Sequence, residues 1–179
     1  KLRTYFIVMK KDNPKNPFNR RSFLEQSGKA AAAGAVLSQL PIERVAHAAD
    51  NDTVSVALVG CGGRGTGAAK QALSTEGPVK LVAMADAFRE RLDGSLNNIS
   101  AQFRNQKERV EVGEAQKFVG PDAYKKAIEL ADVVILTTPP GFRPYMFAEA
   151  VKQGKHVFME KPVATDAHGV RIVLEAAKE

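Results

Sequence analysis

Residues 53–67, with the sequence TVSVALVGCGGRGTG, decide the fold class of this chain. The apolar segment Val54–Val59 runs directly into a cluster of glycines, three of which follow the spacing Gly60-x-Gly62-x-x-Gly65. That spacing, after a strand and before a helix, is typical of a turn that binds a dinucleotide. Glycine-rich turns also occur without a ligand, so the rest of the chain must support this interpretation.

Each glycine of the turn has its own expected task. Gly60 permits the tight turn, Gly62 lets a phosphate approach the backbone, and Gly65 lets the helix pack against the sheet. The N–H groups around Gly63 and Arg64 have no partners within the helix, so they would face the pyrophosphate of a dinucleotide.

After this turn the chain alternates between short apolar runs and longer amphipathic runs. The apolar runs predict strands over residues 54–59, 79–85, 110–112, 133–136 and 155–159. Spacings of three and four predict helices over residues 65–73, 88–103, 122–130 and 142–150, and a last helix that begins at Asp166. Asp122 is expected to cap its helix. The alternation implies βαβ units, so we expect an α/β fold: a doubly wound, Rossmann-type parallel sheet with helices on both faces.

Polar and turn residues follow the predicted strands, at the edge where ligands bind to such sheets. The glycine turn follows the first strand, Asp86 the second, residues 137–140 a later one, and Glu160-Lys161-Pro162 the last. We therefore expect one crevice that binds a cofactor through Gly60, Gly62, Gly63, Arg64, Gly65, Asp86, Thr137, Thr138, Pro139, Glu160 and Lys161.

Asp86 is the candidate for binding the ribose of the cofactor. It lies 21 positions after Gly65, close to the spacing of about 20 residues expected for the acid that binds ribose hydroxyls. A carboxylate accepts hydrogen bonds from the ribose diol and repels a 2′-phosphate, so NAD is the expected cofactor. Arg89 and Arg91 lie close enough in the sequence to keep NADP open. An Asp that only caps the following helix is compatible with the same position.

Lys161 is the candidate catalytic residue, because it directly follows a strand that ends in the expected crevice. Its ammonium group could hold a substrate hydroxyl, favour loss of the hydroxyl proton and stabilise the developing alkoxide during hydride transfer. The alternative is a surface lysine that pairs with Glu160, although Pro162 favours a fixed direction for Lys161.

The composition argues against several other kinds of site. A single cysteine, Cys61, allows no intramolecular disulfide and suggests no metal cluster. His156 and His168 are expected to be structural, and the sequence has no Ser-His-Asp set or Walker loop. Residues 1–48 carry nine Lys/Arg and three Asp/Glu, which accounts for the whole net charge of +6, whereas residues 49–179 carry seventeen of each. The folded part therefore offers no electrostatic case for binding nucleic acid.

Residues 1–48 are interpreted as an export signal. The run Asn19-Arg20-Arg21-Ser22-Phe23-Leu24 resembles a twin-arginine signal, and an alanine-rich apolar run over residues 30–40 follows it. Cleavage is expected near Ala48 or Ala49, and the alternative is an amphipathic helix with an incidental arginine pair. The apolar run is shorter than the roughly 20 residues that span a bilayer, so no stable membrane insertion is expected after cleavage. The protein is therefore predicted to be periplasmic or otherwise exported.

Several motifs match those of a known family. They are the glycine turn, Ala85-Asp86-Ala87, Thr138-Pro139 and, above all, GKHVFMEKP over residues 154–162. On these motifs, residues 53–179 resemble the Gfo/Idh/MocA family, that of glucose–fructose oxidoreductase and inositol dehydrogenase. The resemblance implies an NAD(P)-binding Rossmann domain in which Lys161 contacts cofactor and substrate. The family often reads T-P-N-x-x-H where this chain has Pro140 and Arg143 in place of Asn and His.

The resemblance also implies an activity and a second, C-terminal domain. Members typically oxidise or reduce a hydroxyl of a sugar or cyclitol with NAD or NADP, and a C-terminal α/β domain supplies most of the substrate pocket and forms homo-oligomers. This chain is expected to be a fragment without that domain, inactive alone, that ends in or after the helix following Glu160-Lys161-Pro162.

Two other functions stay open. Twin-arginine export moves folded proteins, so NAD could be loaded before export and retained. A retained cofactor suggests an NAD-dependent glycosidase similar to the exported α-N-acetylgalactosaminidases of the family, which oxidise a sugar transiently. The second alternative is a protein that binds a sugar or nucleotide without catalysis.

Overall fold

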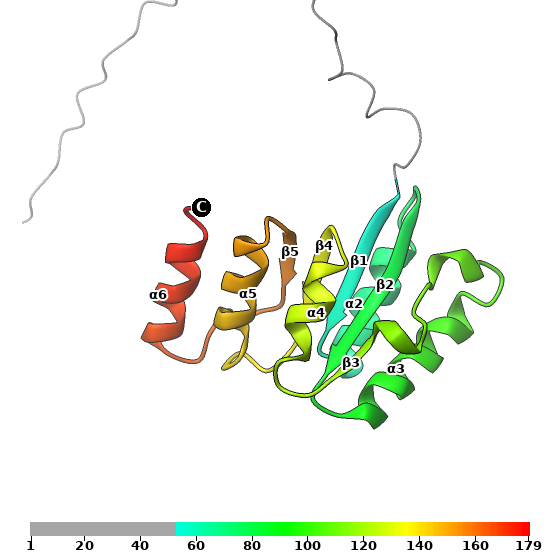
Figure 1. Ribbon diagram of the computed structural model, residues 1–179, viewed down its shortest axis with the longest axis horizontal. Coiled ribbons are helices and arrows are strands. Elements are labelled where there is room, and N and C mark those ends of the chain that lie inside the picture. The colour runs from blue at the N-terminus through cyan, green and yellow to red at the C-terminus, as the bar shows by residue number, and fades with distance from the viewer. Residues whose placement is uncertain (1–52) are drawn as a thin grey trace, which may run out of the picture. The chain divides into compact units, whose positions relative to one another are not determined.

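The computed structural model describes residues 53–179, whose strands form one parallel sheet (Figure 1). The predicted export signal, residues 1–48, lies outside the described residues. The strands are β1 (Val54–Val59), β2 (Val79–Asp86), β3 (Lys117–Val119), β4 (Val133–Leu136) and β5 (His156–Met159). The helices are α2 (Gly63–Leu73), α3 (Arg89–Gln102), α4 (Ala123–Glu129), α5 (Arg143–Lys152) and α6 (Ala167–Ala176), with short 3-10 turns η1 (Lys107–Arg109) and η2 (Glu114–Gln116).

The strand order in the sheet is β3-β2-β1-β4-β5, and all four neighbouring pairs are parallel. The chain builds outward from β1, first toward β3 and then, in the opposite direction, toward β5. This is the order of a Rossmann-type sheet, and the reversal leaves a crevice beyond the carboxyl ends of β1 and β4. The predicted fold class is therefore confirmed.

Helices cover both faces of the sheet, because successive strand residues point to opposite sides. Leu58 of β1 is buried with Leu73 of α2 and Ile99 of α3 on one face. Its neighbour Val59 is buried on the other face, with Ile128 of α4. Helix α5 covers this second face as well, and α6 packs against α5 at the edge of the sheet (Figure 1).

The predicted strand at residues 110–112 is wrong. Val110 forms only an isolated bridge with Leu81, and the third strand is β3, which pairs with the carboxyl end of β2. With only three residues, Lys117–Val119 is too short to show the alternation of apolar and polar residues that predicts a strand.

The helices begin and end within about two residues of the predicted positions, and one of the two predicted N-terminal aspartates caps its helix. Asp166 caps α6, because its Oδ1 accepts a hydrogen bond of 2.7 Å from the N–H of Gly169. Gly154 follows α5 with a φ of 67°. The predicted cap at Asp122 is wrong: its side chain makes no cap hydrogen bond and pairs with Lys125 over 2.8 Å instead. The physical reason is a near-helical backbone at Asp122, which does not have the extended geometry of a capping residue.

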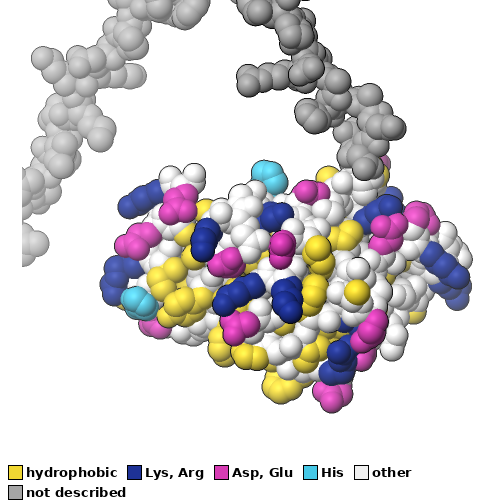
Figure 2. Space-filling view, in the orientation of Figure 1, with side chains coloured by type: hydrophobic (Ala, Val, Ile, Leu, Met, Phe, Trp, Pro, Cys, Tyr) yellow, Lys and Arg dark blue, Asp and Glu magenta, His cyan; other side chains and the backbone are white. Residues whose placement is uncertain are grey.

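The surface carries both signs of charge. Figure 2 shows Lys/Arg and Asp/Glu side chains interspersed over the face that it presents. Within residues 53–179, no helix has the length and apolar character needed to cross a membrane. In the same part of the chain, no three His, Cys, Asp or Glu side chains gather as the ligands of a metal ion would.

Candidate functional site

The chain leaves β1 through Gly60, whose backbone φ is 95°. This is the left-handed region, which residues with a Cβ rarely adopt. A Cβ at Gly60 would also lie 2.6 Å from the backbone N of Thr138 and 2.8 Å from the carbonyl carbon of Thr137. The turn therefore requires glycine for its backbone angle and for the close approach of the end of β4.

Gly65 lets the start of α2 pack closely against the backbone at Gly60. A Cβ at Gly65 would overlap with the carbonyl oxygen of Gly60 and lie 2.5 Å from Oγ1 of Thr137. The Thr137 hydroxyl donates a hydrogen bond of 2.6 Å to that carbonyl oxygen. The end of β1, the start of α2 and the end of β4 thus meet around Gly65, which leaves no room for a larger residue.

The start of α2 has backbone donors available to a ligand. Its N-cap residue is Gly62, which offers no side chain to accept from them, and its first turn has no acidic residue. The space beside Gly62 is open, because a Cβ there would meet no atom closer than Nη1 of Arg91, at 3.8 Å. Unpaired N–H groups at a helix start favour an anion such as a phosphate. The residues present therefore fit the pyrophosphate of a dinucleotide.

Asp86, at the end of β2, faces the glycine turn. Its Oδ2 accepts a hydrogen bond of 2.7 Å from the N–H of Cys61, and its Oδ1 accepts one of 3.0 Å from the N–H of Phe88. A carboxylate has about four acceptor positions, so further ones remain for ribose hydroxyls. Asp86 thus stabilises both the glycine turn and the turn before α3. These contacts are compatible with the predicted binding of ribose.

A cavity of about 630 Å³ lies along this edge of the sheet. Its volume falls within the roughly 300–1,000 Å³ that is usual for small-molecule sites. The structure brings together in its wall the predicted residues Gly60, Gly62, Asp86, Thr137, Thr138 and Pro139. The remaining predicted residues, which are Gly63, Arg64, Gly65, Glu160 and Lys161, do not line it.

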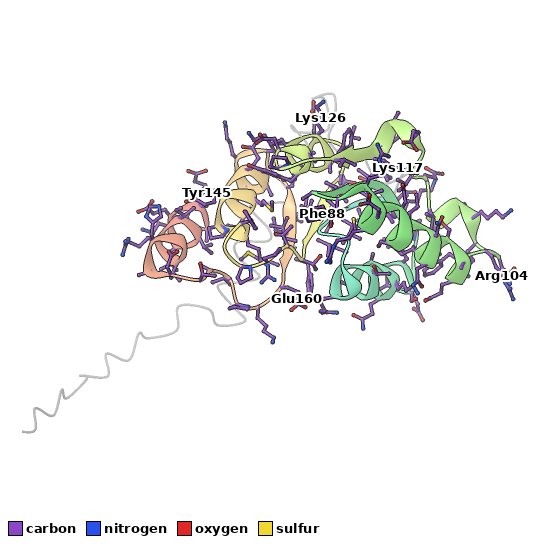
Figure 3. All side chains as sticks on the ribbon, turned by 90° about the horizontal axis from the view of Figure 1, so that it is seen from below. Phe88, Arg104, Lys117, Lys126, Tyr145 and Glu160 are labelled. Carbon is purple, nitrogen blue, oxygen red and sulfur yellow. The ribbon has the colours of Figure 1, made fainter. Side chains whose placement is uncertain are left out.

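The cavity wall contains residues that sequence reasoning missed. Helical spacing places Phe88 and Phe142 in predicted helices without assigning them to a site, and in the structure both are 60% exposed and line the cavity. Figure 3, which views this edge of the sheet, shows Phe88 over its middle. Their position in the sequence could have indicated this, since each residue follows closely after the end of a strand, where ligands bind to such sheets. Others in the wall are Arg91, Gly120, Pro121, Tyr124, Arg143 and Met146.

Arg64 and Glu160 connect the glycine turn to the end of β5. Nε of Arg64 donates a hydrogen bond of 2.6 Å to Oε1 of Glu160, and the two side chains form an ion pair. This contact lowers the pKa of the Glu160 carboxyl from its usual value. Figure 3, which looks onto the carboxyl ends of the strands, shows Glu160 at the lower side of this surface. In the described part of the chain Glu160 thus pairs with Arg64, and the alternative of a Lys161–Glu160 ion pair is wrong.

Lys161 is exposed, and the backbone on either side of it is bound by Arg143. Arg143 donates from Nε to the carbonyl oxygen of Thr138, and from Nη1 to those of Glu160 and Pro162, each over 2.6 Å. Burial lowers the pKa of the Arg143 guanidinium, and the negative charge of Glu160 opposes that shift. Sequence reasoning noted Arg143 only as a departure from a motif, because its partners are backbone groups distant in sequence.

The other candidate groups do not take part in the site. Cys61 is buried, and burial raises the pKa of its thiol, so the thiol stays protonated and is no nucleophile. His156 and His168 are both exposed and do not line the cavity.

The sheet order, the glycine turn at an open helix start and the cavity over the strand ends define a nucleotide-binding α/β domain. Comparison with protein families makes this more specific. Residues 54–179 match the family GFO_IDH_MocA, an oxidoreductase family with an NAD-binding Rossmann fold. The chain belongs to this family, and the matched residues form its NAD-binding domain.

Curated relatives include glycosyl hydrolase family 109 proteins. The chain is 29% identical over 164 residues to a glycosyl hydrolase family 109 protein of Shewanella pealeana, and 29% identical over 179 residues to one of Shewanella baltica. These matches cover 82% and 89% of this chain but 34% and 37% of the relatives. The chain thus spans about a third of the length of the curated relatives it matches.

Solved structures share the fold. Myo-inositol 2-dehydrogenase from Lactobacillus plantarum superimposes with a TM-score of 0.53 at 24% identity, covering 70% of this chain and 33% of that one. Myo-inositol dehydrogenase from Lactobacillus casei, solved with NAD(H) and myo-inositol, gives 0.56 at 17% identity, covering 69% and 33%. At these identities the likeness supports the fold alone.

Proposed function

We propose that the complete protein is an NAD(P)-dependent oxidoreductase that transfers a hydride to or from a hydroxyl group of a sugar or cyclitol. The observation that carries the proposal is the position of Lys161, in a loop that Arg64 and Arg143 hold beside the glycine turn. A cation carried by a fixed loop beside the glycine turn suits a reaction in which negative charge develops on a substrate oxygen. Membership of an oxidoreductase family supports the same reaction class.

The residues of this chain bind and orient the reactants in this proposal. NAD, when bound, supplies the nicotinamide ring that accepts or donates the hydride. Asp86 accepts hydrogen bonds from ribose hydroxyls, and the N–H groups at the start of α2 face the pyrophosphate. Lys161 holds the substrate hydroxyl, and its positive charge favours departure of the hydroxyl proton.

The substrate class is supported by relatives. The Shewanella proteins are named as glycosyl hydrolases, and the Lactobacillus casei dehydrogenase was solved with myo-inositol. A glycoside and an inositol both present a ring with several hydroxyl groups, so a sugar or cyclitol is the class that the two have in common.

The test uses the complete protein, NAD+ and a panel of myo-inositol, glucose, galactose and N-acetylgalactosamine. We expect NADH to form with at least one compound. Lys161→Met should abolish that formation and leave NAD+ binding intact, as measured by calorimetry. Unchanged turnover in Lys161→Met would remove Lys161 from the reaction. Binding of NAD+ without turnover of any compound would favour the non-catalytic alternative.

A second function is favoured by the Shewanella relatives, which are named as glycosidases. In an NAD-dependent glycosidase, transient oxidation of one sugar carbon acidifies the neighbouring C–H, and loss of that proton expels the leaving group. Water then adds to the double bond that this elimination leaves, and the hydride is returned to the oxidised carbon, so no NADH accumulates. Release of nitrophenol from 4-nitrophenyl α-N-acetylgalactosaminide, without net NADH, would favour this function over the simple dehydrogenase.

We also propose that the protein is exported through the twin-arginine pathway and is a homo-oligomer. The arginine pair and the alanine-rich run of residues 1–48 support export. N-terminal sequencing of the exported protein should begin near Ala49, and Arg20→Lys with Arg21→Lys should block export. An intact leader on exported protein would contradict this proposal. Light scattering of the complete protein tests the oligomeric state, and a monomer would contradict it.

A further inference from the structure

Arg143 is a buried cation whose partners are backbone carbonyl groups. It is the first residue of α5 and is 6% exposed. Its Nε and Nη1 donate three hydrogen bonds of 2.6 Å, to the carbonyl oxygens of Thr138, Glu160 and Pro162. Within residues 53–179 it forms no ion pair, since Glu160 pairs with Arg64.

A cation in this place is costly for the fold. Burial removes the charge from water, and the start of a helix is the positive end of its dipole, which disfavours a cation. An apolar side chain would fill the same space without either cost. The three hydrogen bonds are therefore the physical reason for an arginine at this position.

These hydrogen bonds join two loops of the candidate site. Thr138 follows β4 and lines the cofactor cavity, whereas the carbonyl groups of Glu160 and Pro162 flank Lys161. The side chain of Lys161 is exposed and makes no hydrogen bond within the described residues, so its direction depends on its backbone. A guanidinium suits this task, because its five N–H donors lie in one rigid plane.

We infer that Arg143 is a positioning residue, which fixes the backbone on both sides of Lys161 relative to Thr138 and so directs the Lys161 ammonium toward the cofactor. The inference rests on the proposed function, in which Lys161 works beside bound NAD. Arg143 acts through Lys161 and does not contact the reacting atoms. Histidine, which the family motif often has at this position, has two ring nitrogens and so can hold at most two of the three carbonyl groups.

The test measures how fast acetic anhydride acetylates Lys161 in the complete protein, by mass spectrometry of peptides. At about 100 times its Kd, NAD+ fills nearly every site and should slow acetylation of Lys161 by roughly tenfold. Lys152, at the other end of α5, is the internal reference, and its rate should not change. In Arg143→Met, NAD+ still binds through the glycine turn and Asp86, but protection of Lys161 should fall below about twofold, because only Arg64, through the side chain of Glu160, then holds the loop.

Arg104→Met is the matched control. It removes an exposed arginine that neither lines the cavity nor has a hydrogen bond to the loop of Lys161, so protection should persist at a saturating concentration of NAD+. Arg143→Lys is the second variant if Arg143→Met does not fold: its ammonium keeps the charge but lacks the planar fork that holds three carbonyl groups, so it should also lose most of the protection. Full protection of Lys161 in a folded Arg143 variant would overturn the inference. Absence of protection in the unaltered protein would instead overturn the proposed function of Lys161.

Discussion

Arg64 and Glu160 lie 96 positions apart in the sequence, yet Nε of Arg64 donates to Oε1 of Glu160 over 2.6 Å. Arg64 belongs to the first turn of α2, and Glu160 directly follows β5. The contact therefore joins the turn where a pyrophosphate is expected to the loop that carries Lys161. Its contribution can be measured without a substrate, because it lowers the pKa of Glu160.

Glu160→Gln is expected to lower the stability of the protein at neutral pH and to have no such effect in acid. Arg64 holds the pKa of folded Glu160 below the unfolded value of about 4.3. A lowered folded-state pKa adds stability above the unfolded pKa, and that stability is lost as the pH falls through the folded pKa. Urea unfolding should show the difference between wild type and variant shrinking below about pH 4. The same pH dependence in an Arg64→Met background would contradict this explanation.

Gly65→Ala should destabilise the domain, because the added Cβ would overlap with the carbonyl oxygen of Gly60. Forcing an extra carbon into a filled space costs about 1–3 kcal/mol. Gly67→Ala, in the same helix, is the control: a Cβ there meets nothing within 4 Å, and alanine should add about 0.5–1 kcal/mol of helix stability. Urea unfolding measures both effects, and equal effects would show that Gly65 is not packed as described.

Asp86→Asn should weaken binding of NAD+ and relax the preference over NADP+. Loss of hydrogen bonds to a charged acceptor costs about 1.5–3 kcal/mol, or roughly ten- to hundredfold in Kd. The neutral side chain no longer repels a 2′-phosphate, and Arg91 lines the same cavity. Asp132→Asn is the control, because Asp132 binds Ser55 at the opposite edge of the sheet. Calorimetry that finds both cofactors bound as tightly as by wild type would remove Asp86 from the ribose site.

Local signals explain what the sequence predicts correctly. A run such as Val54–Val59 and a turn residue such as Gly60 owe their structure to their immediate neighbours, so periodicity and turn chemistry identify them. Asp86 follows from its spacing to the glycine turn, and the structure places it in the cavity wall. These features together fix the sheet and one side of the candidate site.

The rest depends on contacts between distant segments. Arg143 looks like an ordinary helix residue until its three carbonyl partners, from the ends of β4 and β5, are known. Phe88 and Phe142 fit a helical face by spacing, but only the packing of the sheet shows that they lie beside a cavity. Strand β3 forms because β2 offers it an open edge, which no pattern within three residues can reveal.

Phe142→Ala should weaken binding of NAD+ by about 1 kcal/mol, roughly fivefold in Kd. The substitution removes an aromatic ring from the cavity wall, and with it the area that the ring would bury against a bound ligand. It should leave the free energy of unfolding nearly unchanged, since Phe142 is already 60% exposed. Tyr145→Ala is the matched control: Tyr145 is 55% exposed and close in sequence, but does not line the cavity. Calorimetry should detect the loss in Phe142→Ala alone, and an equal loss in both variants would mean that the ligand does not lie against Phe142.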